Sequence, residues 1–336
     1  MAKIVARKKV AILLFGSSIL PDLGIRTKNP KRQVLDTWAK RHAELQVLAN
    51  VDVQFVPTEG PVTSAENWVR LGSVLRSGLR RYDGFVVIHD LETMAYTGSM
   101  LAMMFRGLGK PVVLTASGAN LVSKVAVKLD SFLDQFGQLG YKVHLLNAIQ
   151  TATLDVSGVL IMFGNRLLKA VRAVRSDDVS TNFFDALGDE YVGSLTLGVR
   201  LLPTAPKRNS TLPAIKVAAD DRVQLIDLQP GVDLHTFERM DLQRAHGFVV
   251  RYADLGTLLR FLSMLDSRID GSVPVVIYSR GVSSPPVSGP NRVFINRMSM
   301  EVTLVKLMWG LGAKLPLAKL RTFMLADQAG EVVSPT

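Results

Sequence analysis

Two short polar stretches of this chain carry side chains that suit acyl chemistry. The first is Phe15-Gly16-Ser17-Ser18-Ile19, after the apolar run 10–14, and the second is His89-Asp90-Leu91-Glu92-Thr93, after the apolar run 85–88. A serine hydroxyl can act as a nucleophile beside a proton acceptor, and the backbone amides of a glycine turn can hold an oxyanion. Small polar residues after a strand are also ordinary loop chemistry, so both interpretations stay open.

The elements around these stretches predict how they are positioned. Runs rich in β-branched residues at 10–14, 51–56, 85–88, 112–115 and 159–163 alternate with helical patterns, which favours a mostly parallel sheet covered by helices on both faces. A capping box at 63–66 predicts the start of a helix whose apolar face includes Trp68, Leu71 and Leu75. Ligands of open α/β sheets bind beyond the carboxyl ends of the strands, where both polar stretches lie.

The pattern predicts two domains. Residues 1–202 form the larger N-terminal α/β domain, and residues 203–222, rich in proline near their start, form a linker. Residues 223–336 form a smaller α/β domain, with strands at 223–228, 247–252 and 275–278 and a late amphipathic helix at 300–311.

Composition excludes several classes of site. The chain has 336 residues, 48% of them hydrophobic, and no cysteine, so thiolate nucleophiles, disulfides and iron-sulfur clusters are excluded. The five histidines lack metal-ligand spacing, and we expect neither a metal nor a cofactor. No apolar run reaches the roughly 18 to 20 residues that span a bilayer, which predicts a soluble protein with no membrane partner. We expect a cytoplasmic protein, with the mitochondrial matrix as the alternative.

Positive charge is concentrated near the N-terminus. The formal net charge is +11, and residues 1–41 contain ten Lys and Arg against two Asp. Such asymmetry favours an anionic partner, with RNA or a ribonucleoprotein complex as the first candidate. The alternative is a solvated basic face that only aids solubility.

Four segments together resemble a known family. The run 82–97, which contains VVIHDLETM, is similar to the bacterial-type L-asparaginase family around its HGTDTM motif, and residues 15–19 stand where that family has TGGTI. Residues 163–168 resemble its FxNRLxRG segment, and residues 300–307 resemble its late MxxEATLxKL helix. The resemblance implies an asparaginase-like α/β fold, hydrolysis of asparagine or glutamine side-chain amides, and homo-oligomers.

The catalytic positions that the resemblance assigns carry altered residues. The nucleophile falls on Ser18, and the threonine of HGTDT falls on Leu91, which has no hydroxyl to relay a proton. The neighbouring aspartate becomes Glu92, one methylene longer, and the lysine becomes Arg175, whose guanidinium stays protonated. These residues act as a unit, so several losses together predict an inactive site. An alternative alignment would assign the catalytic role to Thr93 or Thr97.

The remaining pocket positions differ as well. The resemblance places the pocket at Gly16, Ser17, Gly60, Asp90 and Thr115. Asp90 stands where the family has glycine and adds negative charge where a substrate carboxylate would approach. Residues 123–142 replace a short family loop and predict an added helix.

The family's mobile lid is replaced by a basic segment at residues 24–32, which lacks the lid tyrosine. We expect this segment to contact phosphate or an acidic protein surface through Arg26, Lys28, Lys31 and Arg32. A second row, Arg166, Lys169 and Arg172 together with Arg175, is expected to extend the surface or to be merely solvated.

Three functions remain. The preferred one is an asparaginase-fold pseudoenzyme that acts as a structural or binding subunit, with an RNA-protein particle as its setting. The second is an active amidohydrolase that uses Ser18 as nucleophile, and the third is an amino-acid sensor without turnover. Homo-oligomerisation is expected unless the protein is recruited to a larger complex.

Overall fold

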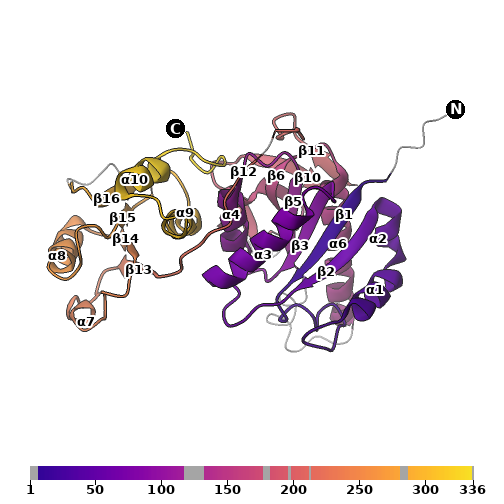
Figure 1. Ribbon diagram of the computed structural model, residues 1–336, viewed down its shortest axis with the longest axis horizontal. Coiled ribbons are helices and arrows are strands. Elements are labelled where there is room, and N and C mark those ends of the chain that lie inside the picture. Colours follow the sequence, from indigo (N-terminus) through magenta and orange to yellow (C-terminus); the bar gives the residue numbers. More distant parts are fainter. Residues whose placement is uncertain are drawn as a thin grey trace. The chain divides into compact units, whose positions relative to one another are not determined.

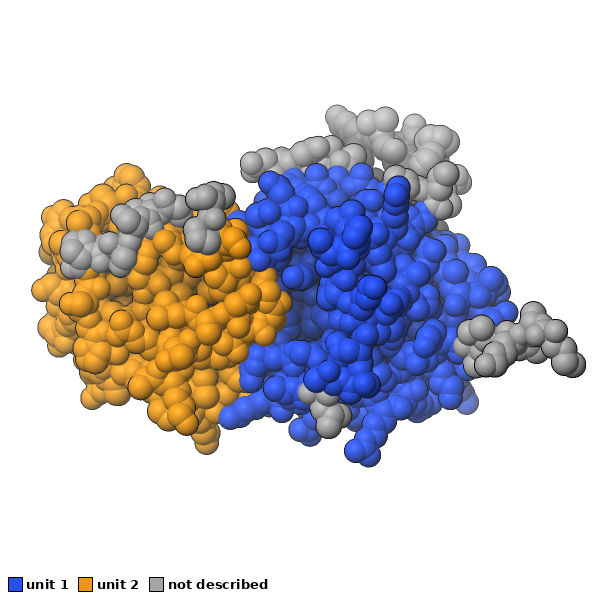
Figure 2. All heavy atoms as spheres, turned by 90° about the horizontal axis from the view of Figure 1, so that it is seen from above, with its two compact units in different colours: residues 1–217 blue, residues 218–336 orange. Residues whose placement is uncertain are grey.

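Two compact units make up the chain. The computed structural model describes residues 7–116, 132–176, 182–195, 198–211, 213–280 and 287–334. The units are Met1–Val217 and Ala218–Thr336 (Figure 2). Their boundary lies inside the segment 203–222 that composition indicated as a linker.

Unit 1 is built on an eight-stranded sheet with the order β11-β10-β7-β6-β5-β3-β1-β2 (Figure 1). Five strands run parallel: β1 (Lys9–Phe15), β2 (Asn50–Val56), β3 (Gly84–His89), β5 (Pro111–Ala116) and β6 (Gly158–Phe163). The other three are antiparallel to their neighbours: β7 (Arg166–Lys169), β10 (Tyr191–Leu195) and β11 (Val199–Leu201). The predicted mostly parallel sheet is confirmed.

Helices cover both faces of this sheet. On one face α1 (Arg32–Arg41), α2 (Ala43–Leu48) and α6 (Phe132–Thr153) bury a core that includes Val10, Ile12 and Leu14 of β1 (Figure 1). On the other face lie α3 (Ala65–Gly78) and α4 (Met94–Met104). Every residue of α4 except Tyr96 is buried, and the helix contains no charged residue. Of the predicted added helix at 123–142, residues 123–131 lie outside the described residues.

The start of α3 differs by one residue from the predicted capping box. Ser64, rather than Thr63, is the N-cap, and its hydroxyl accepts a hydrogen bond of 3.3 Å from the amide of Asn67. The buried Asn67 side chain accepts from the amide of Glu59 and donates to the carbonyls of Glu59 and Pro61. The side chain of Asn67, at the third helical position, thereby holds the loop before the helix. The glutamate of a capping box is not needed for this.

Unit 2 contains four parallel strands in sequence order, β13 (Val223–Leu228), β14 (Gly247–Tyr252), β15 (Val275–Tyr278) and β16 (Arg292–Ile295). Its helices are α7 (His235–Glu238), α8 (Leu255–Asp266), α9 (Met300–Gly312) and α10 (Leu317–Leu325). Asp254 and Ser299 cap α8 and α9 by accepting hydrogen bonds from backbone amides. The smaller α/β domain predicted from sequence is confirmed.

The described residues between 203 and 217 pack as part of unit 1. The Arg208 guanidinium donates to the carbonyls of Asp83, Ala152 and Leu154 over distances of 2.5 to 2.6 Å. A little further on, β12 (Ala214–Ile215) pairs with β4 (Phe105–Arg106). Arg208 thus holds the proline-rich segment against the end of α6 and the residue before β3. The composition of the segment did not indicate this contact.

Candidate functional site

The turn after β1 brings the first polar stretch against the end of β2. Gly16 has φ +89° and donates its amide to the Val56 carbonyl at 3.0 Å. A Cβ placed on Gly16 would lie 3.3 Å from Oγ1 of Thr58 and 3.6 Å from Oγ of Ser18. The left-handed backbone and the close threonine both favour glycine here. Gly16, Ser18 and Thr58 therefore form one small polar cluster.

The turn after β3 joins this cluster through a single hydrogen bond. Strands β1 and β3 are parallel neighbours, so their carboxyl ends meet at one edge of the sheet. The exposed Ser18 hydroxyl donates to Oδ2 of Asp90 at 2.9 Å. The structure thus places a hydroxyl nucleophile candidate beside a carboxylate that can accept its proton.

Leu91 fills the turn between the two carboxylates. Its side chain is only 8% exposed, whereas Glu92 lies on the surface. Burial of a leucine is worth roughly 1.5 to 3 kcal/mol. The turn is stabilised by apolar packing at this position, and Leu91 supplies no group that can carry a proton.

His89, the last residue of β3, is fully buried within a hydrogen-bond chain. Its Nδ1 lies 2.7 Å from the carbonyl of Asp90, and its Nε2 lies 2.8 Å from Oγ1 of Thr97, which also accepts from Nε1 of Trp68 at 2.9 Å. Because a carbonyl only accepts, Nδ1 carries the proton and Nε2 accepts from Thr97. Burial lowers the pKa of His89, which keeps the ring neutral.

Two further hydroxyls at this edge are buried without a hydrogen-bond partner in the part of the chain that the structure describes. Thr115 lies in β5 with no exposure, paired in register with Ile88 of β3, and Thr93 is the N-cap of α4. The Thr97 hydroxyl, by contrast, is engaged on both sides. Thr97 thus joins α3 to β3, and the alternative that assigns the relay threonine to Thr93 or Thr97 stays a prediction.

The carboxyl edge of the sheet thus gathers Gly16, Ser18, Thr58 and Asp90. A family model described as "Asparaginase, N-terminal" matches residues 9–206, more than half of the chain. The chain belongs to the asparaginase family. The fold and the family that the sequence motifs indicated are both confirmed.

Individual relatives agree with this assignment. L-asparaginase 1 of Escherichia coli K12 is 26% identical over 286 residues, covering 80% of each chain. A glutamyl-tRNA(Gln) amidotransferase subunit of Thermoplasma acidophilum is 25% identical over 292 residues, covering 80% of this chain and 66% of that one. The solved structure of L-asparaginase I from Vibrio cholerae shares the fold, with a TM-score of 0.74, 20% identity and coverage of 98% of this chain and 100% of that chain.

Arg175, at the lysine position of the family, is exposed at the end of β8 (Ala173–Arg175). Its guanidinium carbon lies 5.1 Å from the ring centroid of Phe183. Among the described residues it makes no hydrogen bond or ion pair. The Arg175 side chain packs on the Phe183 ring, and no contact within the described ranges links it to Ser18 or Leu91.

Residues 19–25, which lead into the basic segment, pack against α1 through buried contacts. Ile19, Leu20, Leu23 and Ile25 are buried, and Nε1 of Trp38 donates to the carbonyl of Leu23 at 3.0 Å. Arg26, Lys28 and Lys31 are exposed and make no ion pair among the described residues. Arg32 is different, because it pairs with Asp36 at 2.9 Å and with Asp52 at 2.7 Å. Three of the four predicted cations are thus available to an outside partner.

The second predicted basic row does not form an open surface. Arg172 is 4% exposed, donates to the Leu187 carbonyl at 3.3 Å and pairs with Glu190 at 3.4 Å. Arg166 pairs with Asp185 and lies over the Tyr191 ring, and Lys169 is half-buried. Carboxylates elsewhere in the chain pair with Arg166 and Arg172, so Arg172 is corrected from a surface residue to a buried structural one.

Sequence reasoning missed two residues near the site. Thr58 lies two residues beyond β2, and the rule about carboxyl ends of strands would have found it had it been applied to β2. Asn67 fixes the loop that contains Gly60, whose φ is +62°. No local pattern indicates that role, because its partners depend on the fold. The described residues hold no group of three or more His, Asp or Glu that could bind a metal.

Proposed function

We propose that this member of the asparaginase family is non-catalytic and serves as a binding or structural subunit of an RNA-protein assembly. The observation that carries the proposal is the buried Leu91, which stands where the family motif has a proton-relaying threonine. Arg175 supports it, because its permanently charged guanidinium replaces a lysine and stacks on Phe183. Removal of several members of a catalytic group that acts as a unit leaves little activity.

Asp90 adds an obstacle to substrate binding. Its carboxylate accepts from Ser18 at 2.9 Å and stands where the family motif has glycine. A substrate α-carboxylate that approached the Ser18 hydroxyl would meet this like charge at close range. The site therefore disfavours free asparagine and glutamine as ligands, which also weighs against an amino-acid sensor.

Two features support a nucleic-acid partner. Arg26, Lys28 and Lys31 are exposed without internal counter-ions in the part of the chain described. Relatives from Thermoplasma acidophilum and Pyrococcus abyssi are, by name, subunits of a glutamyl-tRNA(Gln) amidotransferase. The same fold in this chain is suited to a subunit role, with the basic segment as the contact to phosphate.

A specific observation also favours the second candidate, an amidohydrolase. The hydrogen bond from Ser18 to Asp90 pairs a hydroxyl with a carboxylate, and such a pair can in principle activate the hydroxyl for attack. The deciding experiment measures ammonia release from L-asparagine and L-glutamine by the purified chain and by Ser18→Ala. We expect no release above the variant. Release that the variant abolishes would establish the amidohydrolase and overturn the non-catalytic proposal.

The RNA contact has its own test, the salt dependence of binding to a single-stranded RNA, measured by fluorescence anisotropy. Each phosphate contact adds about 0.7 to the slope of log K against log salt concentration. The test variant replaces Arg26, Lys28 and Lys31 with glutamine. It should bind the RNA more weakly and lower the slope by about 2. A matched control replaces Arg239, Lys319 and Arg321 of unit 2 with glutamine. It removes the same charge and should leave the slope unchanged. Equal slopes for both triple variants would refute the contact.

A further inference from the structure

A hollow separates the basic segment from α1. It is lined by residues 24–27 of the segment and by Gln33, Val34, Thr37, Trp38 and Arg41 of α1, and its volume is about 750 Å³. Sites for small ligands are typically about 300 to 1,000 Å³. The hollow is distinct from the carboxyl edge of the sheet, since neither Ser18 nor Asp90 lines it.

The walls of the hollow are held by buried contacts. Ile25 and Trp38 are each 4% exposed, Trp38 donates to the carbonyl of Leu23, and its ring stacks on His42 with centroids 4.6 Å apart. The turns of the segment close through backbone bonds, including the amide of Ile25 to the carbonyl of Leu20 at 2.9 Å. A preformed site loses less entropy when a ligand binds.

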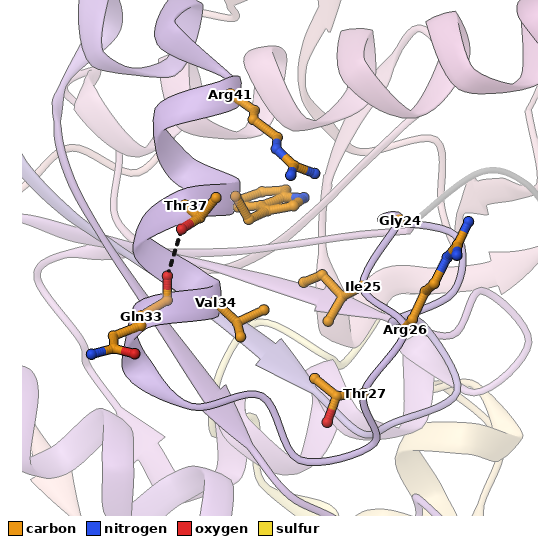
Figure 3. A pocket seen from close by; sticks show the side chains of 9 residues that line it. Gly24, Ile25, Arg26, Thr27, Gln33, Val34, Thr37 and Arg41 are labelled. Carbon is orange, nitrogen blue, oxygen red and sulfur yellow. Dashed lines mark hydrogen bonds between the residues drawn. The ribbon is translucent and has the colours of Figure 1, made fainter.

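The charge of the lining is positive only. None of its nine residues is acidic, and exposed arginines stand on both walls, Arg26 on the segment and Arg41 in the last turn of α1 (Figure 3). Neither guanidinium makes an ion pair or hydrogen bond among the described residues. Arginine presents planar donors that match the oxygens of a phosphoryl group.

The rest of the lining suits a ligand body that is flat and only partly polar. Val34, 38% exposed, and Ile25 face one another across the hollow (Figure 3). The Thr37 hydroxyl is already bonded to the Gln33 carbonyl at 2.8 Å. The Thr27 hydroxyl and the Gln33 side-chain amide, by contrast, have no partner within the described ranges. The lining therefore offers two facing apolar side chains, two cations and two further polar groups.

We propose that this hollow binds a nucleoside phosphate, free or as the phosphorylated end of an RNA chain, with the phosphoryl group between Arg26 and Arg41. The nucleoside packs on Ile25 and Val34, and the Gln33 amide and Thr27 hydroxyl are within the lining to bond its polar edge. This inference rests on the proposed function, because it gives the basic segment a defined nucleic-acid ligand.

Calorimetric titration of the full chain at low salt tests the proposal with AMP, adenosine and inorganic phosphate. AMP is expected to bind about tenfold or more tightly than adenosine or inorganic phosphate, since only AMP contacts both the arginines and the apolar side chains of Ile25 and Val34. Arg26→Ala and Arg41→Ala should each weaken AMP binding about tenfold, as expected for the loss of a charge-assisted hydrogen bond. Lys40→Ala and Lys319→Ala remove the same charge outside both the lining and the basic segment, and each should change AMP binding less than about threefold.

Absence of AMP binding, equal losses in the lysine variants, or phosphate binding as tight as AMP binding would overturn the site. A tetraribonucleotide with and without a 5′ phosphate then identifies the source. Tighter binding than AMP that requires the 5′ phosphate indicates a chain end, and binding no tighter than AMP indicates the free nucleotide; both retain the site. If AMP does not bind but RNA binding keeps its salt slope, the nucleoside-phosphate site is refuted and the proposed function stands. If the chain releases ammonia in a reaction that requires Ser18, the proposed function is refuted and the nucleoside-phosphate site stands.

Discussion

Thr97 shows how a single hydroxyl organises the buried side of the carboxyl edge. It accepts from Trp68 on α3 and donates to His89 on β3, so it joins the helix to the strand that carries Asp90. The neutral His89 ring then donates to the Asp90 carbonyl, which places the carboxylate of that residue next to Ser18. At the scale of residues, the position of Asp90 depends on a chain of fully buried donors and acceptors.

Thr97→Val is expected to reduce the free energy of unfolding by about 2 to 6 kcal/mol. Valine keeps the shape of threonine but leaves Nε1 of Trp68 and Nε2 of His89 buried without a partner, at about 1 to 3 kcal/mol each. Thr97→Ser keeps the hydroxyl and should lose only about 1 kcal/mol, for the missing methyl. Urea denaturation measures both. A valine variant as stable as the serine variant would contradict the network.

The packing of α4 against the segment after β7 requires a glycine. A Cβ on Gly98 would lie 2.7 Å from the Cβ of Ala170, the first residue of the 3₁₀ turn Ala170–Arg172. The neighbouring Ser99 hydroxyl donates to the Ala170 carbonyl at 3.4 Å. At the scale of elements, this close approach sets the path of the chain toward β8 and Arg175.

Gly98→Ala should therefore destabilise the protein, although alanine is favoured over glycine in a helix by about 1 kcal/mol. Overpacking typically costs about 1 to 3 kcal/mol, and here both clashing atoms are fixed to the backbone, so the net loss is expected to be about 1 kcal/mol or more. The double variant Gly98→Ala with Ala170→Gly removes the clash and should recover most of the melting temperature. No recovery would indicate a different cause.

Unit 2 depends on a buried ion pair between its helices and its C-terminal segment. Lys306 of α9 and Glu331 are both fully buried and bonded to one another, and Lys306 also donates to the Ala326 carbonyl at 2.6 Å. The Glu331 carboxylate accepts from the amides of Gln328 and Ala329. At the scale of the whole molecule, this pair ties residues 326–331 to the core of the smaller unit.

Lys306→Met is expected to cost about 3 to 5 kcal/mol, because it leaves a buried carboxylate without its cation. Lys319→Met on the exposed face of α10 is the matched control and should change stability by less than about 0.5 kcal/mol. Urea denaturation measures the loss, and hydrogen exchange of residues 300–312 locates it in α9. Similar stability of the two variants would show that the pair contributes nothing.

Much of the architecture could be read from local patterns, whereas the pairing of side chains could not. Alternation of β-branched runs with helical periods predicted the parallel sheet, because burial on both faces imposes that pattern on each strand by itself. The substitution of Leu91 for a hydroxyl residue was likewise visible in one motif. Local patterns did not show the hydrogen bond of Ser18 to Asp90, the burial of Arg172 or the hydrogen bonds by which Arg208 holds the linker. Those contacts join residues far apart in the chain, and only strand register and helix packing bring their atoms within bonding distance.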